Sequence, residues 1–260
     1  MPSVAMVQAR MGSTRLKGKV MAEILGKPMI WHIVTRLRQV PEVGLVVVAT
    51  STHVANQPLA DYCRRETIPV FRGSEDDVLD RFYQAARIFD ADPIIRVTGD
   101  CPFVDGPLIS ELIRFYGEGN WEHLGVATGA GAVFLDSGRY PDGLDAECFS
   151  FNALRRAWEE AIEPSDREHV TPYIWRVPGR FRTAALTAPA DYSRYRWTVD
   201  NGADLDLARE IYRELYAKNP AFSMHDILKL IERRPELAAL NAQFIGREGY
   251  DRVWEGGATR

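Results

Sequence analysis

Short apolar runs alternate along the chain with segments whose apolar residues recur at helical spacing. Residues 4–7 form an apolar run that is followed at once by polar residues and glycine, and residues 44–50 are rich in β-branched apolar residues. Such runs are typical of strands that are buried on both faces of a parallel sheet. Between them, residues 28–40 place apolar residues three and four positions apart, which predicts a helix with Pro28 in its first turn.

The alternation continues towards the C-terminus. Further strands are predicted at residues 68–71, 93–98, 144–149, 181–186 and 194–199, and further helices at residues 77–89, 107–116, 152–161, 167–175, 203–216 and 224–233. Strands that alternate with helices of this length indicate right-handed βαβ units. We therefore expect an α/β fold with a mostly parallel central sheet that is covered on both faces.

The pattern predicts a single domain over residues 1–234. Periodicity weakens and glycine becomes frequent at residues 121–143, which we interpret as a loop-rich excursion that serves as a lid or a dimer contact. Residues 235–260 are polar and contain glycine, and we interpret them as a C-terminal tail. No internal repeat is present.

Composition narrows the possible partners. The 260 residues are 46% hydrophobic, and 32 basic and 36 acidic residues give a formal net charge of −4, which disfavours nucleic acid as a partner. Three widely spaced cysteines form neither a disulfide framework nor a metal-binding spacing and favour a reducing, cytoplasmic location. The apolar N-terminal run is too short for a membrane span or a signal peptide.

A basic, glycine-bearing segment follows the first predicted strand at residues 8–19. Convergent backbone amides and fixed positive charge are what a triphosphate-binding loop requires, and glycine permits close approach to the phosphates. Loops at the carboxyl ends of parallel strands commonly bind ligands, although a solvated basic turn is the alternative. The loop residues predicted to bind a nucleotide are Gln8, Ala9, Arg10, Gly12, Ser13, Arg15 and Lys19.

Two well-known phosphate motifs do not fit the chain. Five residues separate Gly12 from Gly18 where a Walker loop has four, and Val20 stands where Ser or Thr would hold magnesium. The glycine-rich residues 125–131 lack the third glycine of a dinucleotide-binding fingerprint. A P-loop ATPase and an NAD-dependent enzyme are therefore disfavoured.

Two acids directly follow predicted strands and are candidate magnesium ligands. Asp100 follows the strand at residues 93–98, and Asp200 follows the strand at residues 194–199. Mg²⁺ prefers one or two carboxylates together with phosphate oxygens and water. For Asp200 the alternative is a helix cap, because a predicted helix begins at residue 203.

Several matching segments make the chain similar to a known family. They are residues 4–37 with the loop Gln-Ala-Arg-Met-Gly-Ser-Thr-Arg-Leu, and residues 70–81, 98–102, 140–145, 167–173 and 196–200. In this order they resemble the cytidylyltransferases that activate 3-deoxy-octulosonate and sialic acids, and in particular the branch of spore coat polysaccharide biosynthesis protein F. The departures are small: Lys17 stands where proline is usual, and Gly99 where alanine is common.

The resemblance implies a three-layer α/β/α nucleotidyltransferase fold of the Rossmann-like, GT-A-like kind, CTP as donor, Mg²⁺ and usually a homodimer. It implies that Arg10, Ser13, Arg15 and Lys19 contact the triphosphate and that Asp100 and Asp200 hold Mg²⁺. We assign Arg15, Lys19, Asp100 and Asp200 as the catalytic residues of a CMP transfer to a small acidic sugar. The family's acceptor-binding residues do not map cleanly onto this chain.

Further candidates come from the remaining polar segments. Arg72 and Ser74 follow a strand and are candidates for binding the base or the phosphates, unless they only cap the next helix. The candidate acceptor-binding residues are Tyr140, Asp142, Asp145, Arg167 and His169. A lone histidine in a helix often has only a structural role, so this alternative stays open for His169.

Three other activities remain open. A glycosyltransferase of similar fold would carry an Asp-x-Asp metal motif, and residues 100–102 lack the second acid. A sugar-nucleotide sensor would not need both acids. A nucleotidyltransferase with a phosphonate acceptor or another base is not distinguished by these residues.

Overall fold

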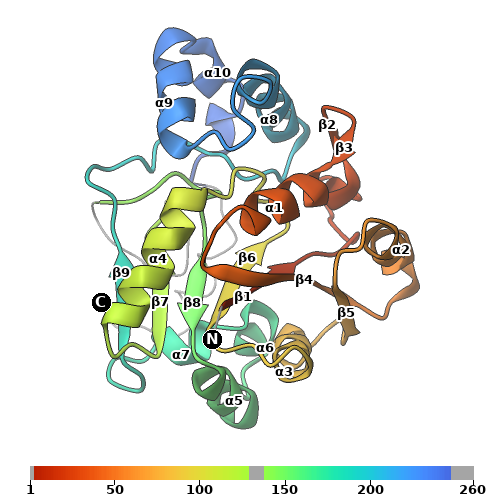
Figure 1. The fold of residues 1–260 in the computed structure, drawn as a ribbon, viewed down its shortest axis with the longest axis vertical. Helices are drawn as coiled ribbons and strands as arrows, with labels where there is room; N and C mark the ends of the chain where they lie inside the picture. The colour runs from red at the N-terminus through yellow and green to blue at the C-terminus, as the bar shows by residue number, and fades with distance from the viewer. Residues whose placement is uncertain (1–2, 129–137, 247–260) are drawn as a thin grey trace.

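The strands form one seven-stranded sheet in a computed structural model, which describes residues 3–128 and 138–246 (Figure 1). Its spatial order is β5 (Val70–Gly73), β4 (Val43–Ser51), β1 (Ser3–Gln8), β6 (Ile94–Thr98), β8 (Glu147–Phe149), β7 (His123–Val126) and β9 (Thr183–Leu186). The first four strands are parallel, β8 is antiparallel to both of its neighbours, and β9 is parallel to β7. The predicted mostly parallel sheet is confirmed. A separate hairpin consists of β2 (Glu23–Ile24) and β3 (Lys27–Pro28).

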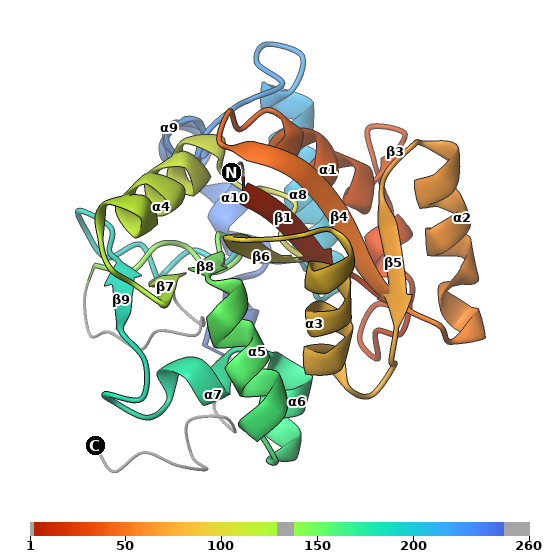
Figure 2. The ribbon, with the colours of Figure 1, turned by 60° about the horizontal axis from the view of Figure 1, so that its bottom comes forward.

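Helices cover both faces of the sheet, as Figure 2 shows. One face carries α1 (Met29–Arg38), α2 (Gln57–Arg65) and α4 (Gly106–Glu118), and the other carries α3 (Val78–Ile88), α5 (Phe151–Glu160), α6 (Pro164–His169) and α7 (Pro172–Trp175). The chain ends on the α1 side with α8 (Gly202–Leu215), α9 (Met224–Arg233) and α10 (Glu236–Ala239). Three short 3₁₀ helices are η1 (Lys19–Met21), η2 (Val54–Asn56) and η3 (Ala242–Phe244).

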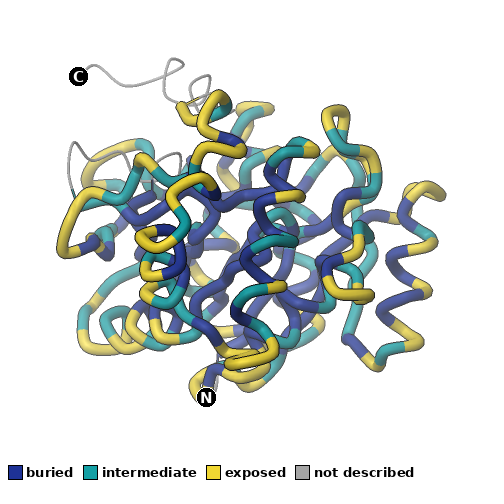
Figure 3. The backbone as a smooth tube through the Cα atoms, turned by 90° about the horizontal axis from the view of Figure 1, so that it is seen from above, coloured by how far each residue is buried: buried dark blue, intermediate teal, exposed yellow. Residues whose placement is uncertain are grey.

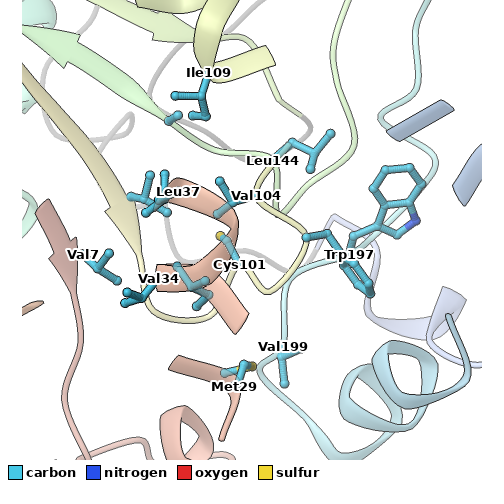
Figure 4. Close-up of a cluster of buried hydrophobic side chains, with 14 of the residues drawn as sticks. Val7, Met29, Val34, Leu37, Cys101, Val104, Ile109, Leu144, Trp197 and Val199 are labelled. Atoms are coloured by element: carbon cyan, nitrogen blue, oxygen red, sulfur yellow. The ribbon is translucent and has the colours of Figure 1, made fainter. Parts of the chain in front are cut away.

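The two cores explain why the central strands carry apolar residues on both faces. Along β1, Ala5 and Val7 pack into the cluster beneath α1 and α4, whereas Val4 and Met6 pack into the cluster beneath α3 and α5. The central strands therefore lie in the buried layer of the chain (Figure 3). Figure 4 shows part of the first cluster, where Val34 and Leu37 of α1 lie close to Val7.

Three elements differ from the predictions. The helix α2 was not predicted, although its buried residues Leu59, Ala60, Tyr62 and Cys63 recur at helical spacing. The strand β7 is fully buried within the segment that we predicted to be loop-rich. Residues 194–199 are extended but do not join the sheet as a strand, and their one bridge pairs Arg196 with Asp142.

Two predicted boundaries also shift. The helix predicted at residues 167–175 is divided into α6 and α7 by Val170, whose φ is +73°, and by Pro172. At the C-terminus, α10 packs against α8 and α9, and Asn241 is 2% exposed. The packed domain therefore continues past residue 234, and the tail predicted at residues 235–260 is wrong for its first part.

The proposed lid or dimer contact at residues 121–143 stays a prediction. Residues 129–137 of that segment lie outside the described residues. Among the described residues, all three cysteines are free and buried, and no helix has the length and apolar character needed to cross a membrane.

We expect Gly143→Ala to destabilise the fold strongly. Gly143 has φ +97°, and an added Cβ would lie 2.3 Å from the backbone nitrogen of Thr198. Gly179 is a matched control, because its φ is +81° but an added Cβ would meet no atom within 4 Å. Backbone strain alone costs roughly 1–3 kcal/mol, and overpacking adds about 1 kcal/mol or more. Urea denaturation should therefore show a larger loss for Gly143→Ala than for Gly179→Ala; equal losses would show that the predicted clash is relieved without cost.

Candidate functional site

A cleft of about 400 Å³ opens where β1 and β6 end. Gln8 pairs with Thr98 in the parallel register, so the segments that follow the two strands leave the sheet at the same edge. The structure brings twelve of the sequence-predicted site residues to this cleft. They are Gln8, Ala9, Arg10, Gly12, Ser13, Arg15, Lys19, Asp100, Asp142, Asp145, His169 and Asp200.

Backbone contacts hold the basic loop against the end of β6. The amide of Gly99 donates to the carbonyl of Gln8 at 2.8 Å, and a Cβ on Gly99 would lie only 3.0 Å from that of Ala9. Farther along, the amide of Met11 donates to Asn56 Oδ1 at 2.7 Å. The amide of Gly18, a residue in the left-handed region with φ +69°, closes the loop on the carbonyl of Met11 at 3.1 Å.

Lys19 lies between the two predicted metal ligands. Its Nζ is 2.8 Å from Asp100 Oδ2 and 2.6 Å from Asp200 Oδ1. The Lys19 side chain is 11% exposed and that of Asp200 is 9% exposed. One buried ammonium therefore bridges two carboxylates that are about a hundred residues apart in the sequence.

The pKa values follow from burial and this pairing. Burial opposes the charge on Lys19, but the carboxylates of Asp100 and Asp200 offset it and raise the pKa of Lys19 above its ordinary value. Burial also opposes ionisation of Asp100, but Lys19 and the hydroxyl of Thr98 bring its pKa down to about 2. Lys19 and Asp100 therefore stay charged at neutral pH.

Asp200 points into the cleft and is not the cap of α8. Its Oδ2 accepts from Arg15 at 2.9 Å and from Arg196 at 3.1 Å. The capping box of α8 is formed instead by Asn201 and Asp204, and Asp204 also accepts from the amide of Asp200 at 3.0 Å. The capping alternative for Asp200 is therefore wrong, because Asn201 is the cap of α8 and Asp204 completes its capping box.

Behind Asp200 lies a polar network that the sequence analysis missed. Arg196 is 3% exposed, and its guanidinium contacts Asp200, Asp204 and Asp142 at 3.0–3.2 Å. From the C-terminal segment, Asn241 Nδ2 donates to Asp204 Oδ1 at 2.8 Å and to the carbonyl of Arg196 at 2.9 Å. No sequence signal links Asn241 to this site, because the contact depends on how α10 packs.

The opposite half of the cleft is lined by acids. Asp145 accepts from Thr128 Oγ1 at 2.6 Å and from the amide of Gly143 at 2.9 Å, and Asp142 accepts from Arg196. Burial raises the pKa of both carboxyl groups, and each also lies in the negative field of neighbouring acids. Burial lowers the pKa of His169, which lines the same half.

The sequence analysis also missed the group that forms the floor of the cleft. Arg96 forms an ion pair with Glu147 and donates to Gln8 Oε1 at 2.9 Å, and His123 lies 2.9 Å from Glu147. Burial opposes the charge of Glu147, but Arg96 and His123 lower its pKa to about 2. Arg96 lies inside a buried strand, and an arginine in such an apolar run is a signal that could have identified it.

Arg81 is a further cleft residue that was missed. It is buried, and its guanidinium donates to the carbonyls of Ser74 and Glu75 at 2.8 and 2.9 Å. Within the described part of the chain, Arg81 forms no ion pair with a carboxylate, and burial lowers its pKa. A buried guanidinium that faces a cleft without a carboxylate partner favours an anionic or carbonyl-bearing ligand.

Four predicted residues do not line the cleft. Arg72 donates to Gln57 and to the carbonyls of Ser51 and Thr52, and Ser74 accepts from the amide of Asp77. Arg167 forms an ion pair with Asp77, with Nε at 3.0 Å from its carboxylate, and Tyr140 is buried in the core. Their side chains are used for internal contacts, so the structure does not support their assignment to ligand binding.

Positively charged side chains and carboxylates thus lie close together at the edge of the sheet where the parallel strands β1 and β6 end. Arg10, Arg15 and Lys19 supply positive charge for phosphate oxygens, and Asp100 and Asp200 supply carboxylates. Among the described residues no group of three or more His, Cys, Asp or Glu side chains is arranged to hold a metal ion by itself. Together, the fold and the site define an α/β nucleotidyltransferase.

The chain belongs to the cytidylyltransferase family, whose sequence model matches residues 4–219. It is 31% identical over 257 residues to an uncharacterized protein of Methanocaldococcus jannaschii, which covers 98% of this chain and 100% of the relative. It is also 31% identical over 239 residues to the spore coat polysaccharide biosynthesis protein SpsF of Bacillus subtilis, covering 89% and 95% of the two chains. The predicted family and a CTP-dependent nucleotidyltransferase activity are therefore confirmed.

Solved structures agree with this assignment. A cytidylyltransferase from Leptospira borgpetersenii superposes with a TM-score of 0.84 and 26% identity, covering 92% of this chain and 97% of that one. A CMP:2-keto-3-deoxy-manno-octonic acid synthetase complexed with CTP superposes with a TM-score of 0.60 and 20% identity, covering 82% and 99%. The second likeness supports the fold alone, and the predicted nucleotidyltransferase fold is confirmed.

We expect Lys19→Met to lower the free energy of unfolding at pH 7 by about 1 kcal/mol more than at pH 3. Asp100 has its pKa lowered from 3.8 to about 2 in the folded protein. The stabilisation from this shift is complete above pH ~5, falls to about half at pH 3 and is mostly lost near pH 2; in full it amounts to roughly 2 kcal/mol. Urea denaturation at the two pH values measures it, with Lys17→Met as the control on an exposed lysine of the same loop. An equal loss at both pH values would show that Lys19 does not hold Asp100 ionised.

Proposed function

We propose that this cytidylyltransferase transfers CMP from CTP to an acidic sugar of the ulosonic-acid or sialic-acid type, for the synthesis of a surface polysaccharide or glycan. The observation that supports CTP as the donor is the position of the Lys19 ammonium, which lies between Asp100 and Asp200 in the same cleft as Arg10 and Arg15. An acceptor oxygen attacks the α-phosphorus of CTP, the bond from that phosphorus to the bridging oxygen of the β-phosphate breaks, and pyrophosphate leaves.

The loop residues bind the triphosphate in this proposal. Arg10, Arg15 and Lys19 offset the negative charge of the phosphates, and Ser13 with the backbone at Ala9 and Gly12 donates hydrogen bonds. Fixed cations around the phosphates stabilise the charge that builds up in the transition state, so no covalent nucleophile is required.

Asp100 and Asp200 are the proposed Mg²⁺ ligands. Their oxygens face a common point, and the Lys19 ammonium at that point shows that the pair accommodates a cation. Two carboxylates completed by phosphate oxygens and water are the donor set that Mg²⁺ prefers, so the residues fit the ion. Mg²⁺, when bound, would neutralise negative charge on the phosphates.

The part of the cleft that we propose for the acceptor sugar contains side chains that donate hydrogen bonds and side chains that accept them. Gln8 Oε1 accepts from Arg96, so the Gln8 amide group is oriented to donate. We propose that Gln8, Arg96 and His169 bind the acceptor carboxylate and that Asp142 and Asp145 accept from its hydroxyl groups. The name of SpsF supports a role in polysaccharide synthesis. A sugar acid as acceptor is supported by the 3-deoxy-manno-octulosonate cytidylyltransferase of Geobacter metallireducens, which is 34% identical over 113 residues, 44% of each chain.

A homodimer and a cytoplasmic location remain predictions. The homodimer rests on the family resemblance, and the location rests on the cysteine content. Size-exclusion chromatography with light scattering tests the first directly.

We expect Asp100→Asn to reduce CMP transfer by at least about 100-fold, because the carboxylate that holds the cation loses its charge. Pyrophosphate release from CTP measures the rate. Asp206→Asn is the matched control, because Asp206 is an exposed acid on α8 outside the cleft. Near-normal turnover of Asp100→Asn would contradict the metal assignment.

The acceptor is tested by a pyrophosphate-release screen with CTP, UTP, ATP and GTP against ulosonic acids, sialic acids and phosphonates. We expect turnover with CTP and a sugar acid only, because the chain belongs to the cytidylyltransferase family and several relatives are named 3-deoxy-manno-octulosonate cytidylyltransferases. Turnover with a phosphonate and with none of the sugar acids would contradict the proposed acceptor class and leave the cytidylyltransferase assignment intact.

A further inference from the structure

All four oxygens of the Asp100–Asp200 pair accept hydrogen bonds from the protein itself. Asp100 Oδ1 accepts from Thr98 and Oδ2 from Lys19. Asp200 Oδ1 accepts from Lys19, and its Oδ2 accepts from Arg15 and Arg196. In this conformation every oxygen of the pair has a partner in the protein, and Lys19 is the group that occupies the point that both carboxylates face.

A divalent cation and the Lys19 ammonium cannot share that point. Nζ lies 2.8 and 2.6 Å from the two carboxylate oxygens, distances at which a second cation would meet both steric overlap and strong repulsion. Because Lys19 and Asp200 are buried, solvent screens this repulsion weakly. Entry of a metal ion between the two acids therefore requires Lys19 to move away.

A polyphosphate is the ligand that would move it. Lys19 and Arg15 each contact Asp200 and also line the cleft beside Arg10. Phosphate oxygens compete with the carboxylates for these two cations. When Lys19 turns to a phosphate, it frees Asp100 Oδ2 and Asp200 Oδ1 for metal coordination, whereas Asp200 Oδ2 keeps Arg196 after Arg15 has left. Binding of the phosphates and binding of the metal ion must then favour each other by the same factor.

We propose that Lys19 is a built-in counter-ion that keeps the Asp100–Asp200 pair closed to divalent cations until a nucleotide triphosphate draws it away, so that nucleotide binding precedes tight metal binding between the acids. The inference rests on the proposed function in one respect, the assignment of Asp100 and Asp200 as metal ligands. It adds a role for Lys19 besides phosphate binding and an order of assembly for the site.

The test is a titration of the protein with Mn²⁺ alone, in which the electron paramagnetic resonance signal reports free Mn²⁺. We expect weak binding by the wild type and at least tenfold tighter binding by Lys19→Met, because the variant leaves two facing carboxylates without their bridging cation. The double variant Lys19→Met/Asp100→Asn should lose this gain, which locates the bound ion between the acids.

Arg15→Met is the matched control for net charge. Arg15 also contacts Asp200, at 2.9 Å, but it is half exposed and does not bridge the two acids. We expect a much smaller gain in Mn²⁺ affinity than for Lys19→Met. An equal gain would show that only the lost charge matters and would overturn the proposal.

Tight Mn²⁺ binding by the wild type without nucleotide would overturn the proposal whether or not any variant folds. Lys19→Gln, which keeps a hydrogen-bond donor at the same point, replaces Lys19→Met if circular dichroism shows the latter to be unfolded. Because no CTP or acceptor is present in the titration, failure of the Lys19 proposal would appear there as an unchanged Mn²⁺ affinity of Lys19→Met, whereas failure of the proposed function would appear as absent pyrophosphate release.

Discussion

The interaction on which the site depends is one buried ammonium, Lys19, between the buried carboxylate of Asp200 and the partly exposed carboxylate of Asp100. Each of these charges would be costly to bury alone, and removing one partner leaves the others uncompensated. Lys19 begins the turn after the basic loop, Asp100 follows β6, and Asp200 precedes α8. The same contact therefore ties the N-terminal loop and the C-terminal helices to the edge of the sheet.

The rest of the fold brings these three residues together. The paired register of β1 and β6 places the loop and Asp100 at one edge, and residues 194–199 cross that edge because the amide of Val199 donates to the carbonyl of Asp100 at 2.8 Å. Behind them, Asn241 supports Arg196 and Asp204. Asn241 lies beyond the family match, which ends at residue 219, so the C-terminal helices add a support for the site that the family model does not describe.

The sequence was informative wherever a general rule of parallel sheets applies. Apolar runs located the central strands, and the rule that ligands bind at their carboxyl ends selected the loop and Asp100. It could not decide whether Asp200 binds a ligand or caps α8, because this acid stands near the start of the helix and only packing orients its side chain; in the structure Asn201 is the cap. The contacts of long side chains were the least predictable. Arg167 forms an ion pair with Asp77, which is far away in the sequence, and does not line the cleft.

Local patterns were also weak where helices and strands depend on packing for their stability. The four-residue strand β7 has little periodic signal, and residues 194–199 have the alternating pattern of a strand but do not join the sheet. In each case the observed structure depends on tertiary contacts, which the local sequence pattern does not reveal.

A double-mutant cycle of Lys19→Met and Asp200→Asn tests the central charge balance most directly. The free energies of unfolding of the wild type, both single variants and the double variant at pH 7 give the coupling between the two side chains. If the ammonium and the carboxylate stabilise each other, the double variant loses less than the sum of the single losses, by at least about 1 kcal/mol. Losses that add to within about 0.5 kcal/mol would show that the two groups act independently and would contradict the central role of the bridge.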